Sequence, residues 1–299
     1  MMLFPPNLKK NDLILIISPA GAVSPCQLSY GISYLHDFGF RTEEGQYLYH
    51  QEGPFAGTDK ERASDLQWAL DHTEAKAIWM ARGGYGTIKC LPKVSWERFV
   101  QHPKWIIGFS DITVLHQKLY QLDIPSIHAP MITQFQEAKA PVDQTINLLK
   151  GERNSITWKT STISLPKEIV GQLIGGNLSI IQSLRGTSLD LDYEDKILFI
   201  EDVDEYHYHI DRMVENLSYS GILDKINTLI VGSFTMIREG NPPMPYSLED
   251  NLKRLSQYHN FHLILDAPIG HIEENHPIIL GSNIKLSIED QKVTLNYMD

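Results

Sequence analysis

Cysteine is scarce in this chain, whose 299 residues include only Cys26 and Cys90. Two cysteines cannot build the disulfide framework of a small secreted domain, and they are too few for a thiolate zinc site. We therefore expect two buried thiols in a reducing compartment. His207 and His209 suggest a metal at first sight, but no third ligand accompanies them at a suitable spacing. We interpret them as surface or lining residues and predict neither a metal nor a cofactor.

Long apolar segments and clusters of basic residues are missing as well. The apolar run at residues 13–17 is far too short to span a bilayer. The first residues place apolar side chains before Lys9 and Lys10, which reverses the order of a secretory signal. With 37 acidic residues against 26 lysines and arginines, the formal net charge of −11 opposes binding to nucleic acid. These features predict a cytoplasmic protein without membrane or nucleic-acid partners.

The composition is that of an ordinary globular protein, with 42% hydrophobic and 21% charged residues. A chain of this length can form two domains that each bury a core. From residue 151 to 167 the hydrophobic periodicity fades into serine, threonine, lysine and proline, which favours a linker. We therefore predict an N-terminal domain over residues 1–150 and a C-terminal domain over residues 168–299.

Strands and helices alternate along the first domain. The β-branched run at 13–17 indicates a strand buried on both faces, and Pro25 at the first position of the next segment indicates a helix start. A capping-box pattern at 58–61 opens a second helix, and apolar runs at 77–80 and 105–109 indicate two further strands. This alternation predicts a parallel, doubly wound α/β sheet.

The second domain has a different texture, in which β/α alternation ends in a hairpin. Its predicted elements are strands at 197–200, 228–231 and 262–265, helices at 177–185, 210–220 and 247–258, and a hairpin of 284–288 with 292–297.

Ser110 stands where the strand at 105–109 passes into a helix. Its hydroxyl would project from the carboxyl edge of the sheet, where open α/β sheets bind ligands. The backbone amide of Asp111, at the start of the helix, could then stabilise an oxyanion. This arrangement resembles a nucleophile elbow, although the second glycine of that motif is missing. The alternative is that Ser110 merely caps the helix.

A glycine-rich loop at 82–86 follows the strand at 77–80 and is expected at the same edge of the sheet as Ser110. Consecutive glycines let backbone amides approach a ligand closely, so Gly84 could supply a second oxyanion donor. A phosphate loop is the competing interpretation, but the loop lacks its Gly-Lys-Ser/Thr ending. An ordinary flexible turn is the third.

A serine nucleophile needs a base, and His271 is the histidine that follows a strand beside turn residues, Pro268 and Gly270. It could equally pack at a domain interface. The base needs an acid to fix its tautomer, and Glu201 ends the apolar strand at 197–200. A solvated acidic loop is the alternative for Glu201.

Five motifs in this order resemble the LD-carboxypeptidase family of serine peptidases, which includes muramoyl-tetrapeptide carboxypeptidases and microcin C immunity hydrolases. The resemblance extends from the first strand to the final hairpin. The motifs are RGGYG at 82–86, GFSDIT at 108–113, GGNL at 175–178, FIED at 199–202 with YHIDR at 208–212, and PIGH at 268–271.

The resemblance implies a Ser-Glu-His triad, which falls on Ser110, Glu201 and His271. Glu205 is the rival acid because it lies in the same loop, and Glu201 is preferred because it matches the family's acid followed by aspartate. The resemblance also implies an N-terminal domain like that of class I glutamine amidotransferases, a swivelling-type C-terminal β/α domain, and a homodimer. Because Ser110 and its partners fall in different domains, the site is expected at the domain interface.

The implied activity is release of the terminal D-alanine from a murein tetrapeptide through an acyl-enzyme. An immunity-type hydrolase of aminoacyl or peptidyl nucleotide conjugates is the alternative activity, and a silent peptide- or nucleotide-binding protein is the alternative of another class. Arg82 and Arg212 could pair with a substrate carboxylate or with protein acids. The residues predicted to contact the substrate are Arg82, Gly83, Tyr85, Asn177 and Arg212.

Overall fold

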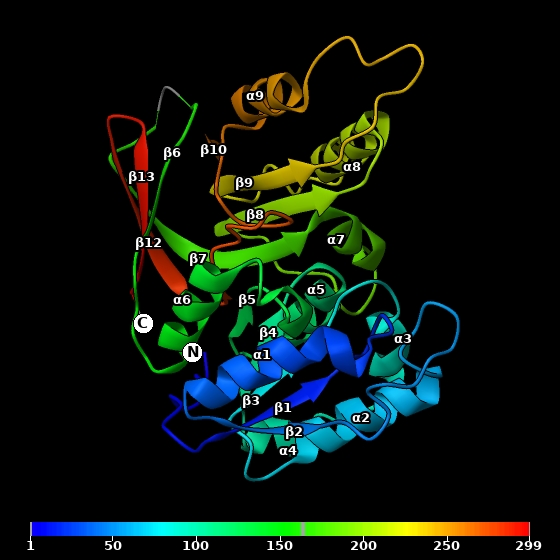
Figure 1. Ribbon diagram of the computed structural model, residues 1–299. Coiled ribbons are helices and arrows are strands. Elements are labelled where there is room, and N and C mark those ends of the chain that lie inside the picture. Colours follow the sequence, from blue (N-terminus) through cyan, green and yellow to red (C-terminus); the bar gives the residue numbers. More distant parts are fainter. Residues whose placement is uncertain (1, 163–164, 299) are drawn as a thin grey trace. The chain divides into compact units, whose positions relative to one another are not determined.

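The computed structural model describes residues 2–162 and 165–298. The chain divides into two compact units. Unit 1 comprises residues 1–154 together with 273–281, and unit 2 comprises residues 155–272 together with 282–299. Each unit is built on one β-sheet (Figure 1). Within the described residues, no helix is both long and apolar enough to cross a membrane.

The sheet of unit 1 has the strand order β11-β5-β4-β3-β1-β2. Its strands are β1 (Leu13–Ile17), β2 (Arg41–Glu44), β3 (Ala77–Met80), β4 (Trp105–Gly108), β5 (Ser126–His128) and β11 (Ile278–Leu280). All pairs are parallel except β11 with β5, so the parallel sheet predicted from the alternation is present. Every residue of β1, β3 and β4 is buried, as expected for strands covered on both faces.

Helices cover both faces of this sheet (Figure 1). One face packs on α2 (Asp59–Asp71), α4 (Glu97–Gln101) and α5 (Thr113–Gln121) in a cluster that includes Leu66, Phe99 and Leu115. On the other face, α1 (Pro25–Asp37) lies beside α6 (Lys139–Leu149), to which Tyr34 donates a hydrogen bond at Asp143. The capping box predicted at 58–61 is present at the start of α2.

The sheet of unit 2 is mixed, with the strand order β10-β9-β8-β7-β12-β13-β6. The four strands from β10 to β7 are parallel, and β12, β13 and β6 continue the sheet antiparallel. The strands are β6 (Ile156–Lys159), β7 (Glu168–Asn177), β8 (Lys196–Val203), β9 (Thr228–Thr235), β10 (His262–Ile264), β12 (Asn283–Glu289) and β13 (Lys292–Tyr297). The predicted hairpin is therefore present as β12 and β13.

The helices of unit 2 are α7 (Leu178–Leu184), α8 (His207–Tyr219) and α9 (Leu248–His259), close to the predicted ranges. Helix α8 begins three residues before the expected Ile210, because Tyr206 has extended backbone and acts as its N-cap. Asn177 caps α7 and Ser247 caps α9 through their side chains. Side-chain capping thus fixes where α7 and α9 start, whereas α8 starts without a side-chain cap.

The structure divides the chain differently from the predicted domain boundaries. The stretch 151–167, predicted as a linker, contains β6, which pairs with β13 and alternates buried and exposed residues. Residues 273–281 return to unit 1, where β11 adds an edge strand beside β5. The prediction of two buried thiols is wrong for Cys26, which is exposed, whereas Cys90 is buried.

Candidate active site

Ser110 follows β4 in a backbone conformation that is rare for a residue with a side chain. Phe109 is extended, and Ser110 then turns to a φ of 62°, the left-handed region. Such a residue stores roughly 1–3 kcal/mol of strain, and these conformations concentrate at functional sites. The N-caps of the 3-10 helix η2 (Ser110–Ile112) and of α5 are Phe109 and Ile112. Ser110 is therefore not a helix cap, which removes the alternative interpretation of this serine.

The glycine-rich loop after β3 packs directly against Ser110. A Cβ atom added at Gly83 would lie 3.2 Å from the Cβ of Ser110 and 3.4 Å from its Oγ. Gly84 and Gly86 have φ values of 121° and 123°, which a residue with a side chain rarely adopts. Gly83 thus brings bare backbone beside the serine hydroxyl, as an oxyanion loop requires, whereas Gly84 packs on the backbone of Gly21.

Two buried charged residues anchor this loop. Thr87, directly after the loop, donates its backbone N–H to Asp111 Oδ2 at 2.9 Å, and burial raises the pKa of the Asp111 carboxyl. Arg62, only 1% exposed, donates from Nη1 to the carbonyls of Gly86 at 2.9 Å and Pro19 at 2.7 Å. Because Asp111 is the next residue after Ser110, its hydrogen bond to Thr87 connects the loop to the segment that carries the serine.

Glu201 and His271 form a hydrogen-bonded pair in unit 2. His271 Nδ1 lies 2.6 Å from Glu201 Oε2. The Glu201 side chain is fully buried, and the imidazole is 18% exposed. A carboxylate on Nδ1 favours the tautomer with the proton on that nitrogen, so Nε2 carries the lone pair that accepts a proton. The pair therefore has the chemistry of a general base with its orienting acid.

The segment that carries His271 is fastened to the end of β9. Ser233 donates its backbone N–H to the carbonyl of Ile269 at 2.8 Å, and Thr235 Oγ1 donates to the carbonyl of His271 at 3.2 Å. Gly270 has a φ of 123°, and a Cβ atom there would lie 2.9 Å from Glu201 Oε2. Only glycine fits this position without displacing the acid.

Glu205, the rival acid, is engaged elsewhere. Its Oε2 lies 2.5 Å from Nδ1 of His209, one helical turn along α8. His207 is buried and lines a pocket, as one of the two predicted alternatives has it, and its Nδ1 lies 2.8 Å from Glu239. No group of three or more potential metal ligands occurs among the residues that the structure describes.

The residues predicted to bind substrate have varied surroundings. Arg82 is exposed and donates from Nη1 to the carbonyl of Ala22 at 3.0 Å. Tyr85 is 55% exposed. Asn177 is buried as the α7 N-cap, with Nδ2 bonded to Asp202 at 2.9 Å. Arg212 is exposed on α8 and lies over the ring of Tyr208 at 5.5 Å.

Sequence reasoning missed Arg62 and Asp202. Burial raises the pKa of Asp202 to about 6, and its carboxylate accepts the backbone N–H of Ser179, so it ties the end of β8 to the start of α7. A signal for Arg62 exists in the helix periodicity, since it stands four residues before Leu66 and seven before Ala69, on the buried face of α2.

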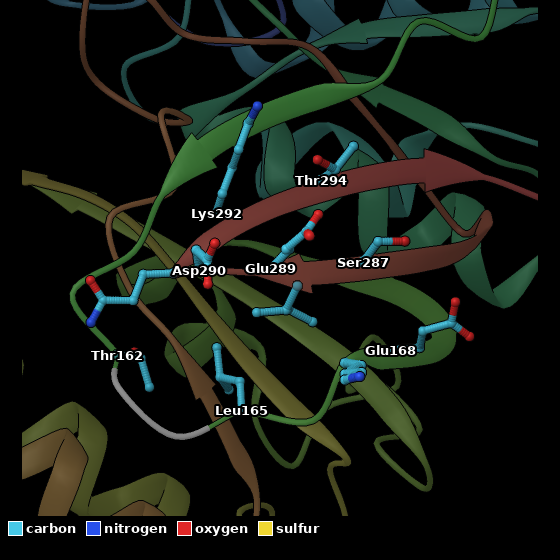
Figure 2. Close-up of a pocket in the computed structure, with 11 residues that line it drawn as sticks. Thr162, Leu165, Glu168, Ser287, Glu289, Asp290, Lys292 and Thr294 are labelled. Atoms are coloured by element: carbon cyan, nitrogen blue, oxygen red, sulfur yellow. The ribbon is translucent and has the colours of Figure 1, made fainter.

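A pocket of about 790 Å³ lies elsewhere in unit 2, on the β12–β13 hairpin. Figure 2 shows Ser287 and Glu289 on one strand and Lys292 and Thr294 on the other. It contains no histidine and none of the predicted site residues. Its size therefore does not make it the candidate active site.

Comparison with known proteins gives a consistent result. A model of the LD-carboxypeptidase N-terminal domain matches residues 14–129, and a model of the LD-carboxypeptidase C-terminal domain matches residues 170–286. The chain is 33% identical to a probable murein peptide carboxypeptidase of Bacillus subtilis, over 77% of this chain and 74% of that protein. It is 25% identical to the microcin C7 self-immunity protein MccF of Escherichia coli, over 77% of each.

Among solved structures, a muramoyltetrapeptide carboxypeptidase from Oxalobacter formigenes matches with a TM-score of 0.88 and 26% identity. The match covers 96% of this chain and 99% of that one. The two-unit α/β fold is therefore shared along nearly the full length of both proteins.

Proposed function

Because the chain belongs to the LD-carboxypeptidase family, we propose that it is a serine carboxypeptidase that releases the terminal D-alanine from a murein tetrapeptide. The similarity to a murein peptide carboxypeptidase and to a muramoyltetrapeptide carboxypeptidase supports this substrate class. The proposed catalytic residues are Ser110 as nucleophile, His271 as general base and Glu201 as its acid.

In the proposed mechanism, the Ser110 hydroxyl attacks the carbonyl carbon of the scissile amide while its proton passes to His271 Nε2. The amides of Gly84 and Asp111 hold the developing oxyanion, and His271 then gives the proton to the leaving amine of D-alanine. Water releases the acyl group from Ser110 by the same steps in reverse. Glu201 stays ionised and stabilises the imidazolium.

The observation that carries this proposal is the 2.6 Å contact between Glu201 Oε2 and His271 Nδ1, in which the acid is fully buried. The strained backbone of Ser110 beside the bare backbone of Gly83 supports its role as the nucleophile.

The proposed substrate contacts follow the same logic. The terminal carboxylate of the peptide calls for a cation, and Arg82 stands at the start of the loop that packs on Ser110. Gly83, Tyr85, Asn177 and Arg212 complete the proposed set. Asn177 would act through its position at the α7 N-terminus, because its side chain is already bonded to Asp202.

The test is Ser110→Ala, assayed with a diaminopimelate or lysine stem tetrapeptide by mass spectrometry. We expect a folded protein with no D-alanine release. Ser29→Ala, on the surface of α1 in the same unit, is the control and should keep full activity. Wild-type-like hydrolysis by Ser110→Ala would exclude the proposed nucleophile.

A second candidate function is hydrolysis of an aminoacyl or peptidyl nucleotide conjugate, as the similarity to a microcin self-immunity protein suggests. Both reactions are acyl transfers, so the same three residues would serve. Parallel incubation of the wild type with the stem tetrapeptide and with glutamyl sulfamoyl adenosine separates the two functions. Binding of either compound by calorimetry without any product would instead identify a silent binding protein.

We also propose the finer description of the fold, a class I glutamine amidotransferase-like first domain and a swivelling-type second domain. The parallel sheet of unit 1 and the β/α order of unit 2 agree with it. The homodimer and the cytoplasmic location stay predictions, to be tested by light scattering and by cell fractionation.

A further inference from the structure

A second group of nucleophilic and titratable side chains lies in unit 2, at the carboxyl ends of α8 and α9. Ser218 is in the last turn of α8, His259 ends α9, and Asp224 follows α8 in the loop to β9. His259 Nδ1 lies 2.7 Å from Asp224 Oδ1, and His259 Nε2 lies 2.7 Å from Ser218 Oγ. No other serine has this arrangement among the hydrogen bonds described for residues 2–162 and 165–298.

The order of atoms in this group is the one that activates a serine. A carboxylate on Nδ1 fixes the proton on that nitrogen, so Nε2 accepts the hydroxyl hydrogen of Ser218. The His259 side chain is only 5% exposed, which holds the ring in this orientation. Ser218 is half-buried and lines a pocket, and its hydroxyl has the base beside it.

A pocket of about 410 Å³ adjoins the group and is lined by Ser218 and His259 themselves. Tyr219 and Tyr258, which are 89% and 79% exposed, line it as well and offer aromatic faces. Arg254 also lines the pocket. Its Nε and Nη2 atoms are bonded within the protein, whereas Nη1 donates no hydrogen bond among the described residues.

We propose that Ser218, His259 and Asp224 form a second hydrolytic site, which acts on small carboxylic esters of phenols. Ser218 Oγ attacks the ester carbonyl while its proton passes to His259 Nε2, and Arg254 lies in the pocket to stabilise the oxyanion. The bond to the phenolic oxygen breaks, and the phenol leaves with the proton from His259. Water then cleaves the acyl-serine, with His259 again taking and returning a proton.

The aromatic leaving group is the part of the substrate that the pocket selects. Tyrosine rings favour offset or edge contacts with another ring. The Arg254 guanidinium would stabilise the negative charge that develops on the carbonyl oxygen. Stabilising that charge usually lowers the barrier to acyl transfer more than any other single interaction. Esters therefore fit this site better than peptides, whose amine is a much poorer leaving group.

The test uses full-length protein carrying Ser110→Ala, so that the first proposed site is silent. p-Nitrophenyl acetate is the substrate, and a fluorophosphonate probe with peptide mass spectrometry locates the reactive serine. We expect the probe on Ser218. Adding Ser218→Ala should remove the labelling and lower ester turnover at least about 100-fold, because proton transfer to His259 alone usually contributes that much.

Asp224→Asn should slow both labelling and ester turnover about tenfold, because the wrong tautomer of His259 is then allowed. Asp224 is 62% exposed, so its replacement leaves no buried cavity. Ser220→Ala is the matched control, since Ser220 bonds Arg185 and the carbonyl of Leu217 and no histidine. Failure of the probe to label Ser218, or equal turnover with and without Ser218→Ala, would overturn the proposal. Neither result bears on Ser110, whose peptidase activity Ser218→Ala should leave unchanged.

Discussion

Replacing Glu201 with glutamine removes the negative charge behind His271 while keeping the size and shape of the side chain. The glutamate has no exposed surface, and its Oε2 lies 2.6 Å from His271 Nδ1. The amide of glutamine can present either its oxygen or its NH₂ group to Nδ1. When it presents the NH₂ group, the imidazole carries its proton on Nε2 and cannot accept one from Ser110.

The expected cost follows from the burial of Glu201. In serine peptidase triads, the carboxylate-to-amide change lowers kcat about 10⁴-fold, which corresponds to about 5 kcal/mol at 1.36 kcal/mol per factor of ten. Water cannot replace the lost charge where the side chain is fully buried, so we expect a loss of about 10³- to 10⁴-fold here. The free energy of unfolding should change by less than about 2 kcal/mol, because the neutral amide avoids the cost of burying a charge.

Steady-state hydrolysis of the stem tetrapeptide measures this effect, and chemical unfolding verifies the fold. Glu205→Gln is a control of identical chemistry, four residues along, because Glu205 bonds His209 instead. KM should stay close to the wild-type value in both variants, since neither glutamate is proposed to bind the substrate. Retention of a tenth or more of kcat in Glu201→Gln, or an equal loss in Glu205→Gln, would refute the reasoning.

Two glycine substitutions test how each unit holds its part of the proposed triad. Gly83→Ala places a methyl group 3.2 Å from the Ser110 Cβ, so the serine must shift by a few tenths of an ångström; kcat should fall about 10- to 100-fold with little change in thermal stability. Gly270→Ala places a methyl group 2.5 Å from Ser233 Oγ at a φ of 123°, and should cost at least about 2 kcal/mol of stability as well as most activity. Gly186→Ala, at a φ of 70° with no atom within 4 Å, should cost about 1 kcal/mol and no activity in the same assays.

The elements that the sequence predicted are those in which one physical signal dominates. The run at 13–17 is β1 because five consecutive apolar residues suit a strand buried on both faces. Strand β7 was not predicted, because it contains Gly171, Gly175 and Gly176, and glycine disfavours strands. Its glycines are required by neighbours that lie far along the chain, since a Cβ at Gly175 would lie 1.9 Å from the carbonyl oxygen of Phe199. Such a requirement is invisible before the strands are paired.

The candidate site was partly predictable for a related reason. Ser110 and Glu201 could be picked out because each follows a hydrophobic run that predicts a buried strand. The structure extends β8 to Val203, so Glu201 lies within the strand, whereas the prediction placed it at the strand's end. The choice between Glu201 and Glu205 could not be made from position, because both stand in one short segment. It depends on the His271 segment being fastened to β9, and on His209 lying one helical turn after Glu205.

The anchors of the site show why its support is harder to predict than its chemistry. Arg62 lies on the buried face of α2, where an unpaired charge would cost free energy. Backbone carbonyls from separate loops accept its hydrogen bonds and offset that cost. Those carbonyls come together only after the sheet of unit 1 has formed. Asp111 depends in the same way on the N–H of Thr87. A catalytic side chain can be found from its position near the end of a predicted strand. A side chain that supports the site depends on partners from elsewhere in the fold. The sequence alone therefore reveals the catalytic residues more readily than their supports.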